Sequence, residues 1–505
     1  MCGIAGFCNF KEDFEENTDY WNFRLEKMRA VLAHRGNDAR GRYLKKHIGL
    51  SHSRLAIRDI LCGDQPMTRT HNGYEYTICY NGEIYNTDEL IPKLSENGFV
   101  CSTTSDTEVI LYAYIHWGAD FVNRLNGIFA FAIWDAAKNR LLLYRDRVGV
   151  KPLFYAIRGD SLVFGSEPKA CFAHPAVKPE LDKQGLQELL AIGPAHTSGL
   201  SLFKDLFEVL PGHFMIYSQN GLHDETYWEL TSREHTESYQ DTVAHTRFLV
   251  EDAIKRQMVS DVPVCTFLSG GIDSSIVTAI AANYMNTRGK TLNTFSFDFK
   301  DNDRYFKANA FQPERDLPYV NRMLEEYETA HSYLECDENS LFKALFAAVD
   351  AKDMPGMTDV DSSLLYFCSL VSRKNKVALT GECADEIFGG YPWFYRKELL
   401  ERYGFPWSSD VAPRLALLRD DVGLELDLSG YQAFRYEESR SKAPLLYGEA
   451  GEDESRRIIG YLNINGSCRH FLTAWIAPAC TPSLRPVYLL PTIVSLSMSL
   501  MCLGI

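Results

Sequence analysis

The second residue of the chain, Cys2, combines two groups that can do chemistry once Met1 has been removed. Its thiol is a nucleophile, and its free α-amine could act as the local base, directly or through a water molecule. An α-amine titrates near neutral pH, so this role needs no histidine partner. Gly3 and Gly6 would let the backbone pack tightly behind the thiol. The alternative is a chance cysteine at a disordered start. Motifs elsewhere in the chain are needed to distinguish a catalytic cysteine from a chance one.

Polar residues in three further loops of the amino-terminal half fit a pocket for glutamine. Arg54 places a guanidinium where it could hold a carboxylate through a forked pair of bonds. The side-chain amide of Asn81 and the N–H of Gly82 could both point at a developing oxyanion. Glu83 and Asp106 could each receive an α-ammonium group. Taken singly, Asn-Gly is commonly just a turn, and Ser-Asp-Thr before a helix is commonly a cap.

A glycine-rich loop in the second half lies between a predicted strand at 262–268 and a predicted helix at 275–285. Such a strand-to-helix loop offers backbone N–H groups and a positive helix terminus to a phosphate chain. No lysine follows the glycines, so this is not the GxxxxGK[ST] loop; instead Asp273 could hold Mg²⁺ against a pyrophosphate. The alternative is a generic glycine-rich turn, which the flanking strand and helix disfavour. The loop reads Ser269, Gly270, Gly271, Ile272, Asp273, Ser274, Ser275.

A second strand end, at 377–391, carries the three carboxylates Glu382, Asp385 and Glu386. The alternative there is an acidic surface loop, and the glycines and apolar residues on either side disfavour it.

The elements that must position these residues differ along the chain. Residues 1–210 contain short β-type runs at 78–80, 127–134, 140–144 and 161–165, interrupted by helical patterns at 24–33 and 107–116. Strands with few helices predict stacked sheets whose loops at one end build a site. Residues 212–245 contain Pro-Gly, Asn-Gly and a polar run, which indicates a passage between domains.

Composition bounds the class of protein. The 505 residues are 46% hydrophobic and 24% charged, as in a globular protein with an ample core. A net charge of −15 argues against a nucleic-acid partner. The 13 cysteines form no CxxC pair, which indicates reduced thiols in a cytoplasmic enzyme. Residues 1–30 lack the basic start and apolar run of a signal peptide.

Together, the amino-terminal motifs resemble the class II glutamine amidotransferases over almost all of residues 2–210. His34-Arg35-Gly36 and the run at 145–153 also match in order and rough spacing, the latter as framework. The resemblance implies an amino-terminal-nucleophile domain of stacked antiparallel sheets. In it Cys2 attacks the amide of glutamine, forms a thioester and releases ammonia, with Asn81 and Gly82 as oxyanion donors. The implied glutamine site comprises Arg54, Leu55, Ala56, Ile57, Arg58, Asn81, Gly82, Glu83 and Asp106.

Both carboxy-terminal motifs, with the glutaminase half, resemble the glutamine-hydrolysing asparagine synthetases from Cys2 to about Asn465. The resemblance implies that ATP adenylates the side-chain carboxylate of aspartate and that ammonia then displaces AMP. It implies a doubly wound α/β domain of the adenine-nucleotide α-hydrolase type, with ATP at the carboxyl ends of the strands. Glu382 would assist acyl-adenylate formation, and Asp273 and Asp385 would share Mg²⁺. The implied ATP site comprises Leu268, Ser269, Gly270, Gly271, Asp273, Ser274, Ser275, Phe297, Thr380 and Gly381.

The expected organisation is a glutaminase domain at 2–211, a transition at 212–245, an ATP-pyrophosphatase domain at 246–465 and an aberrant tail at 466–505. Glutamine, aspartate and ATP are the expected partners, with no nucleic acid or membrane and with a homodimer as the expected assembly. Two alternatives stay open: amidation of another carboxylate, and a glutaminase-only or inactive protein. An amidophosphoribosyl transferase would share the cysteine half but should lack the Ser-Gly-Gly-Ile-Asp-Ser loop.

The tail departs from the family. Residues 466–505 contain no Asp, Glu or Lys and only two arginines. Codons can be chosen that encode residues 466–476 in one reading frame. When the same codons are read one nucleotide out of frame, they encode the helix W-F-M-Q-T-L-L-D-R-M-D-R that family members carry here. We therefore expect a frameshift near Asn465, with impaired or absent synthetase activity. The competing interpretation is an apolar membrane anchor at 486–505, which Pro491 and the absence of a basic flank weaken.

Overall fold

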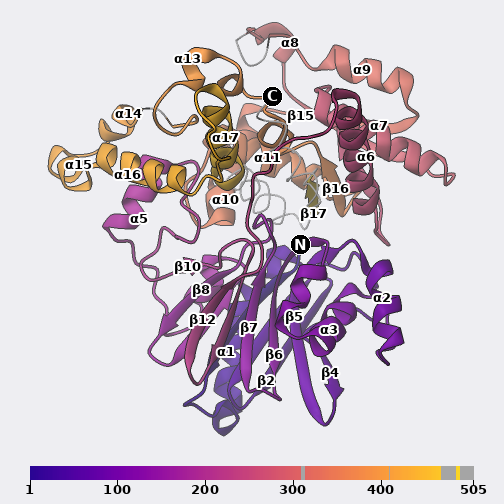
Figure 1. Cartoon of the computed structure of the whole chain (residues 1–505), viewed down its shortest axis with the longest axis vertical. Helices are drawn as coiled ribbons and strands as arrows, with labels where there is room; N and C mark the ends of the chain where they lie inside the picture. The colour runs from indigo at the N-terminus through magenta and orange to yellow at the C-terminus, as the bar shows by residue number, and fades with distance from the viewer. Residues whose placement is uncertain (309–312, 409, 468–484, 489–505) are drawn as a thin grey trace. The chain divides into compact units, whose positions relative to one another are not determined.

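The computed structural model describes residues 1–308, 313–408, 410–467 and the strand at 485–488, which form two compact units (Figure 1). The first unit joins Met1–His235 to residues 386–467, and the second comprises Thr236–Asp385 with residues 485–488. The predicted ATP domain at 246–465 is thus divided between the units after Asp385. Within the predicted transition at 212–245, residues 213–226 contain two strands of the first unit.

Two six-stranded antiparallel sheets form the centre of the first unit. The first sheet has the order β10 (Phe207–Glu208), β8 (Phe154–Arg158), β9 (Ser161–Gly165), β1 (Gly3–Asn9), β3 (Ile48–Arg54) and β2 (Ala39–Lys45). The second has the order β12 (Gly221–Thr226), β11 (His213–Ser218), β7 (Arg140–Arg145), β6 (Gly127–Asp135), β5 (Tyr74–Ile84) and β4 (Met67–His71). The expected stacked antiparallel sheets are confirmed.

In strand β6, side chains that point alternately to the two faces of the sheet contribute to the core on each side. Successive side chains of a strand point to opposite faces of its sheet. Phe129 and Phe131 accordingly pack with the helices that cover the second sheet, whereas Ala130 and Ala132 face the first sheet across the sandwich. Small side chains on the inner face let the two sheets pack closely, and the strand is buried on both faces.

Helices cover both outer faces of this sandwich. On the first sheet lie α1 (Thr18–Ala30) and α4 (Pro168–Phe172), and on the second lie α2 (Thr87–Glu96) and α3 (Asp106–Trp117). The short elements are η1 (Phe14–Asn17), η2 (Ala33–Arg35), η3 (Ala119–Arg124), α5 (Lys183–Gln187) and η4 (Glu188–Ile192). Helix α1 begins six residues earlier than predicted, because the side chain of Asn17 caps it by accepting the Tyr20 N–H.

The later part of the first unit is helical. It contains η5 (Pro392–Phe394), α13 (Lys397–Leu400), α14 (Ala412–Leu415), α15 (Asp420–Leu426), α16 (Leu428–Ser441), α17 (Glu452–Leu462) and η6 (Asn463–Ser467). The short helix α12 (Ala384–Phe388) contains the boundary between the units. Tyr436 of α16 and Ile458 of α17 share an apolar cluster with Ala191 and Ile192 of η4, and this packing joins the helices to the amino-terminal part.

The second unit is a parallel sheet flanked by helices. Its strand order is β15 (Thr329–Cys336), β14 (Leu292–Phe299), β13 (Val264–Phe267), β16 (Val377–Thr380) and β17 (Arg485–Tyr488). Its helices are α6 (Tyr239–Gln257), α7 (Ile272–Asn286), α8 (Asn302–Tyr305), α9 (Leu317–Glu326), α10 (Glu338–Lys352) and α11 (Thr358–Val371). The strand order reverses direction at β13, so the expected doubly wound α/β architecture is confirmed, with its switch point beside β13 and β16.

The predicted aberrant tail lies outside the described residues, apart from 466–467 and the backbone of β17, which pairs with β16. The frameshift prediction and the competing anchor at 486–505 therefore stay predictions. Across the described stretches, no helix has both the length and the apolar character needed to cross a membrane.

Candidate functional sites

The register between β1 and β3 places Cys2. Gly3 lies opposite Ser53, so the residue before β1 comes beside the residues that follow β3. The Sγ atom of Cys2 accepts the backbone N–H of Leu55 at 3.4 Å and lies 3.7 Å from the Leu55 carbonyl oxygen. The thiol is therefore held at one end of the first sheet, partly exposed.

A buried ion pair fixes the backbone of Cys2. The Nε of Arg35 donates to the Cys2 carbonyl oxygen at 3.0 Å, and its Nη1 donates to Glu167 Oε1 at 2.6 Å. Burial alone would raise the pKa of the Glu167 carboxyl, but Arg35, with His34 and Lys169 nearby, holds it well below its ordinary value. The sequence analysis noted Arg35 only within a family motif and missed Glu167, which lies 132 residues further along the chain.

The residues predicted to bind an oxyanion lie near the end of β5. The Nδ2 atom of Asn81 is buried and has no hydrogen-bond partner among the described residues. A Cβ atom on Gly82 would lie 2.3 Å from the carbonyl oxygen of Ile128, so a side chain is excluded there. The next residue, Glu83, is also buried. A buried amide without a partner is costly unless a ligand satisfies it, which is what an oxyanion donor requires.

Asp106 connects the start of α3 to this strand end. Its Oδ2 accepts the Tyr80 hydroxyl at 2.9 Å and the Ile84 N–H at 3.0 Å. The carboxylate is therefore buried and oriented beside 80–84, where a cationic group of a substrate could be bound.

Arg54 is bound to its own loop. Its Nη2 donates to the Asp59 carbonyl oxygen at 2.6 Å, and its Nη1 donates to Ile60 O at 3.1 Å and Asp64 Oδ1 at 2.9 Å. A Cβ on Gly63 would lie 2.4 Å from Nη2, so the loop closes tightly around the guanidinium. The side chain thus shapes the 59–64 loop, and its predicted contact with a substrate carboxylate stays a prediction.

The remaining predicted residues of this segment join the same region. The guanidinium of Arg58 donates to Ile84 O at 3.1 Å and to Thr87 Oγ1 at 2.8 Å. The buried members are Leu55, Ala56 and Ile57. Residues 54–58, 80–84 and 106 therefore lie near one another at one end of the sandwich. Arg54 ends β3, residues 80–84 belong to β5 and Asp106 begins α3, so these predicted residues lie at the ends of strands and a helix and not in loops. That they form a glutamine pocket stays a prediction.

A neutral histidine joins the two sheets behind this region. Nε2 of His52, on β3, lies 3.0 Å from the carbonyl oxygen of Tyr80, on β5. Burial lowers the pKa of His52 to about 4, so the ring is uncharged at neutral pH. Sequence reasoning missed this residue, because a single histidine within a strand carries no functional signal of its own.

The glycine-rich loop of the second unit is closed by its own serines. Ser274 Oγ accepts the Ser269 N–H at 3.2 Å and donates to Gly271 O at 3.1 Å. Gly270 has a φ of +84°, and a Cβ there would lie 2.7 Å from Tyr319 Cβ. The loop leads directly into α7, so its N–H groups and the helix terminus can bind an anion together.

Two carboxylates of the second unit lie close to this loop. A Cβ on Gly381 would lie 2.8 Å from Asp273 Cβ, so the end of β16 contacts the first turn of α7. Burial, and then the charge of Asp385, raises the pKa of Asp273 to about 6, and burial raises the pKa of Asp385. A cation would relieve this repulsion, and carboxylate oxygens are ligands that Mg²⁺ prefers. No cluster of three or more potential metal ligands occurs in the described part of the chain, so phosphate oxygens and water would have to complete the shell.

The other predicted ATP residues follow the same strand ends. Thr380 ends β16, and its Oγ1 is buried without a hydrogen-bond partner in the described structure. Phe297 lies on β14 with its ring centroid 5.1 Å from that of Phe367, and Leu268 is buried directly after β13. Glu382 follows Gly381 and is half-buried. These positions fit a nucleotide at the carboxyl ends of β13, β14 and β16.

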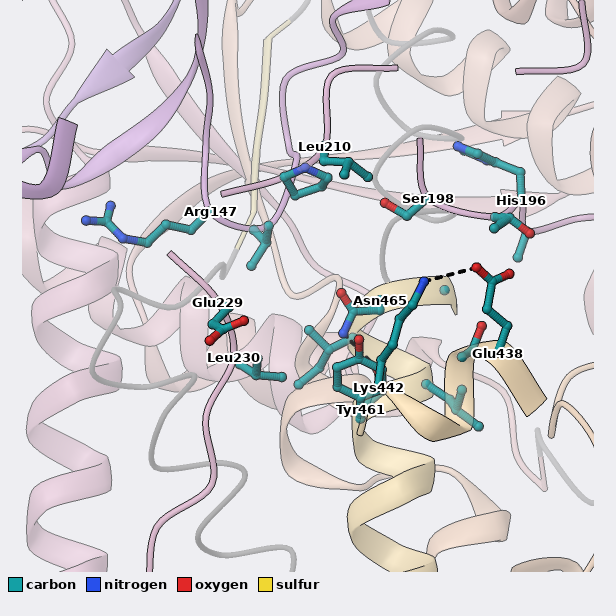
Figure 2. Close-up of a pocket in the computed structure, with 18 of the residues that line it drawn as sticks. Arg147, His196, Ser198, Leu210, Glu229, Leu230, Glu438, Lys442, Tyr461 and Asn465 are labelled. Atoms are coloured by element: carbon teal, nitrogen blue, oxygen red, sulfur yellow. Dashed lines mark hydrogen bonds and ion pairs between the residues drawn. The ribbon is translucent and has the colours of Figure 1, made fainter. Parts of the chain in front are cut away.

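A separate cavity of about 390 Å³ lies in the first unit and is lined by none of the residues predicted to act in catalysis or binding (Figure 2). Lys442 Nζ and Glu438 Oε1 form an ion pair at its wall, 3.1 Å apart. His196 also lines it, with Nε2 3.1 Å from Glu208 Oε1. Burial alone would lower the pKa of His196, but the Glu208 carboxylate raises it. The aromatic residues of its wall are Trp228, Phe405, Trp407 and Tyr461.

Two family models match the chain in succession. A glutamine amidotransferase domain matches residues 1–228, and an asparagine synthase model matches residues 245–481.

Several curated proteins are similar over most of the chain. The chain is 47% identical to "asparagine synthetase [glutamine-hydrolyzing] 3" of Bacillus subtilis over 92% of its own length and 75% of that protein. It is 32% identical to a putative asparagine synthetase of Methanocaldococcus jannaschii, over 77% of this chain and 76% of that protein. It is 31% identical to the amidase chyE of Penicillium rubens, over 82% of this chain and 62% of that protein.

Among solved structures, a glutamine phosphoribosylpyrophosphate amidotransferase from B. subtilis matches with a TM-score of 0.35 and 14% identity. That match covers 72% of this chain and 92% of the other.

Proposed function

Because the chain belongs to the family of glutamine-hydrolysing asparagine synthetases, we propose that it converts L-aspartate to L-asparagine with glutamine as ammonia donor. The reaction consumes ATP and releases AMP, pyrophosphate and glutamate. One observation carries the glutaminase half: Cys2 Sγ lies against Leu55 at the end of the first sheet, where the predicted glutamine-binding segments meet.

In the glutaminase half, Cys2 acts as nucleophile after removal of Met1. Its thiol transfers a proton to its own α-amine, and sulfur attacks the side-chain amide carbon of glutamine. The side-chain N–H of Asn81, which otherwise has no partner among the described residues, donates to the oxyanion together with the N–H of Gly82. The amine then returns the proton to the departing nitrogen, ammonia leaves, and water hydrolyses the thioester to glutamate. Asp106, with Glu83, binds the α-ammonium of the substrate.

In the synthetase half, the loop at 269–275 binds the phosphate chain of ATP, with Thr380 and Gly381 on the facing strand end. Asp273 and Asp385 would hold Mg²⁺, which would supply charge neutralisation to the phosphates. Their raised pKa values fit such a site, because burial penalises the charge of both carboxylates, and the charge of Asp385 adds to this at Asp273; a bound cation would offset both effects. Glu382 assists formation of the acyl-adenylate, and Phe297 lies where its backbone can contact adenine.

The test measures glutamate, asparagine and pyrophosphate separately, with glutamine and then with free ammonia as donor. We expect all three products from glutamine and the last two from ammonia. Cys2→Ala should abolish glutamine use and retain ammonia-dependent synthesis; loss of both would contradict a model with two separate sites. Glutamate release without pyrophosphate would identify a glutaminase-only protein, and pyrophosphate release without asparagine would indicate another acceptor.

We also propose that the enzyme works in the cytoplasm as a homodimer, without a nucleic-acid or membrane partner. The net charge of −15 supports the absence of a nucleic-acid partner. The described cysteines are all free, which supports a reducing compartment. Analytical ultracentrifugation of the purified chain tests the dimer, and a monomer across the micromolar range would contradict it.

A further inference from the structure

Helix α10 of the second unit carries a row of exposed apolar side chains. Phe342 and Phe346 are each 64% exposed, and Val349 is 37% exposed. Their spacing of four and then three residues places all three on one face of the helix. The two phenyl rings meet edge to face, with centroids 5.7 Å apart. The row is therefore one continuous apolar patch.

The opposite face of α10 is already buried within the second unit. Ala344 and Ala351 share an apolar cluster with Leu365 of α11. Packing within the unit thus uses the alanine face and leaves the phenylalanine row outside. On α6, by contrast, the exposed Tyr239 and Phe248 are nine residues apart and so lie on opposite faces of their helix. Exposed aromatic residues on that helix form no comparable row.

The size of the row suits the centre of an interface. An aromatic side chain buries about 150–250 Å², so two phenyl groups at 64% exposure present about 200–300 Å² of apolar surface on each copy of the chain. Exposed patches of this size are often functional. A stable interface buries about 800 Å² on each partner, so the residues around the row must supply the rest. We therefore expect a reversible association.

One edge of the row carries two opposite charges. Lys343 and Asp350 are both exposed and lie seven residues apart, close to two helical turns, so they share an edge and are about 10 Å apart along the axis. This arrangement is self-complementary, because turning the helix end for end exchanges the two positions. A carboxylate can accept hydrogen bonds from several donors, so a bond that Asp350 makes within its own chain still permits a second one.

We propose that two copies of this chain associate through α10, with the two helices antiparallel across a twofold axis beside residues 346 and 347. Such an axis brings Lys343 of each copy to Asp350 of the other. It also sets the two Phe346 rings side by side and places each Phe342 beside Val349 of the other copy. A parallel pair would instead put Lys343 level with Lys343 and Asp350 level with Asp350. The inference rests on the homodimer proposed above and identifies its interface.

The first experiment compares the wild-type chain, Phe346→Asp and Phe248→Asp by sedimentation velocity over about 1–100 μM, with urea unfolding to show that each variant is folded. Phe346→Asp should raise the dimer dissociation constant about tenfold or more, because it places two carboxylates together at the twofold axis. Phe248, which is 63% exposed on α6, provides the matched control, and its variant should keep the wild-type constant. A wild-type dimer that survives Phe346→Asp would refute the interface and keep the dimer. A wild-type monomer would contradict both.

Charge exchange tests the register of the two helices. Lys343→Glu and Asp350→Lys should each weaken the dimer, because each puts like charges opposite one another. A 1:1 mixture of these two variants should form a heterodimer, and the double variant should dimerise as the wild type does, since both restore the two pairs. If neither combination restores association, the antiparallel register is wrong. Neither measurement uses catalysis, so a chain without asparagine synthesis could still show this interface.

Discussion

Replacing Asn81 should separate catalysis from stability. Its Nδ2 is buried and makes no hydrogen bond within the described structure, so Asn81→Ala breaks no bond made by that atom and relieves an unsatisfied donor. The relief, about 1–3 kcal/mol, offsets the small cavity that the truncation leaves. Loss of one oxyanion donor should lower glutaminase kcat about 10²–10³-fold, equivalent to about 3–4 kcal/mol of transition-state stabilisation. Stopped assays of glutamate release and urea unfolding of the same preparations measure the two effects.

Asn86 provides the matched control. It is the same residue type, is also buried, and lies five positions further on, but both ends of its amide are bonded. Nδ2 donates to Arg124 O at 2.9 Å, and Oδ1 accepts the Asn126 N–H at 2.9 Å. Asn86→Ala should therefore lose about 2–3 kcal/mol of stability, with a smaller loss of kcat. The reasoning is refuted if Asn81→Ala keeps kcat within threefold, or if it destabilises the protein as much as Asn86→Ala does.

The remaining predictions concern charged groups. Arg35→Met leaves Glu167 buried without its main partner and should cost about 3–5 kcal/mol of unfolding free energy at pH 7. Because Arg35 depresses the pKa of Glu167, this loss should be present above pH of about 4.3 and fade below it, which urea midpoints between pH 3 and 7 measure. For Asp273, with its pKa raised to about 6, Mg²⁺-dependent pyrophosphate release should fall as the pH drops through about 6, because the metal must displace a proton. Asp273→Asn should abolish pyrophosphate release and keep glutaminase activity; equal loss of both would contradict separate sites.

Much of the site region was predictable because its signals are local. The strand end at 80–84 and the glycine-rich loop at 269–275 carry short motifs whose order and spacing along the chain are informative, although each motif taken singly also occurs in ordinary turns. Helix α3 was placed within one residue at each end, because Ser105 caps it and a continuous apolar run follows the cap. The roles of Asn81 and Asp273 within these segments stay predictions.

What sequence reasoning missed depends on contacts between distant segments. Glu167 meets Arg35 across 132 residues, and no local pattern marks it as a partner. Likewise, nothing in the composition of α16 and α17 shows that their apolar faces pack on η4 of the amino-terminal part. An amphipathic pattern predicts that one face of a helix packs against an apolar surface, but the sequence of the helix does not identify that surface.

The burial of Met1, which is 2% exposed, limits when the chain can mature. Strand β1 pairs with β3 on one side and with β9 on the other, so the amino terminus is enclosed only after residue 165 has been made. At synthesis rates of about 5–20 residues per second, translation from β1 to β9 takes roughly 10–30 s. An aminopeptidase that must reach Met1 has to act within that interval, while the nascent chain is still open. If Cys2 is the nucleophile, as proposed, a chain that keeps Met1 beyond this interval would fold with the α-amine of Cys2 still blocked.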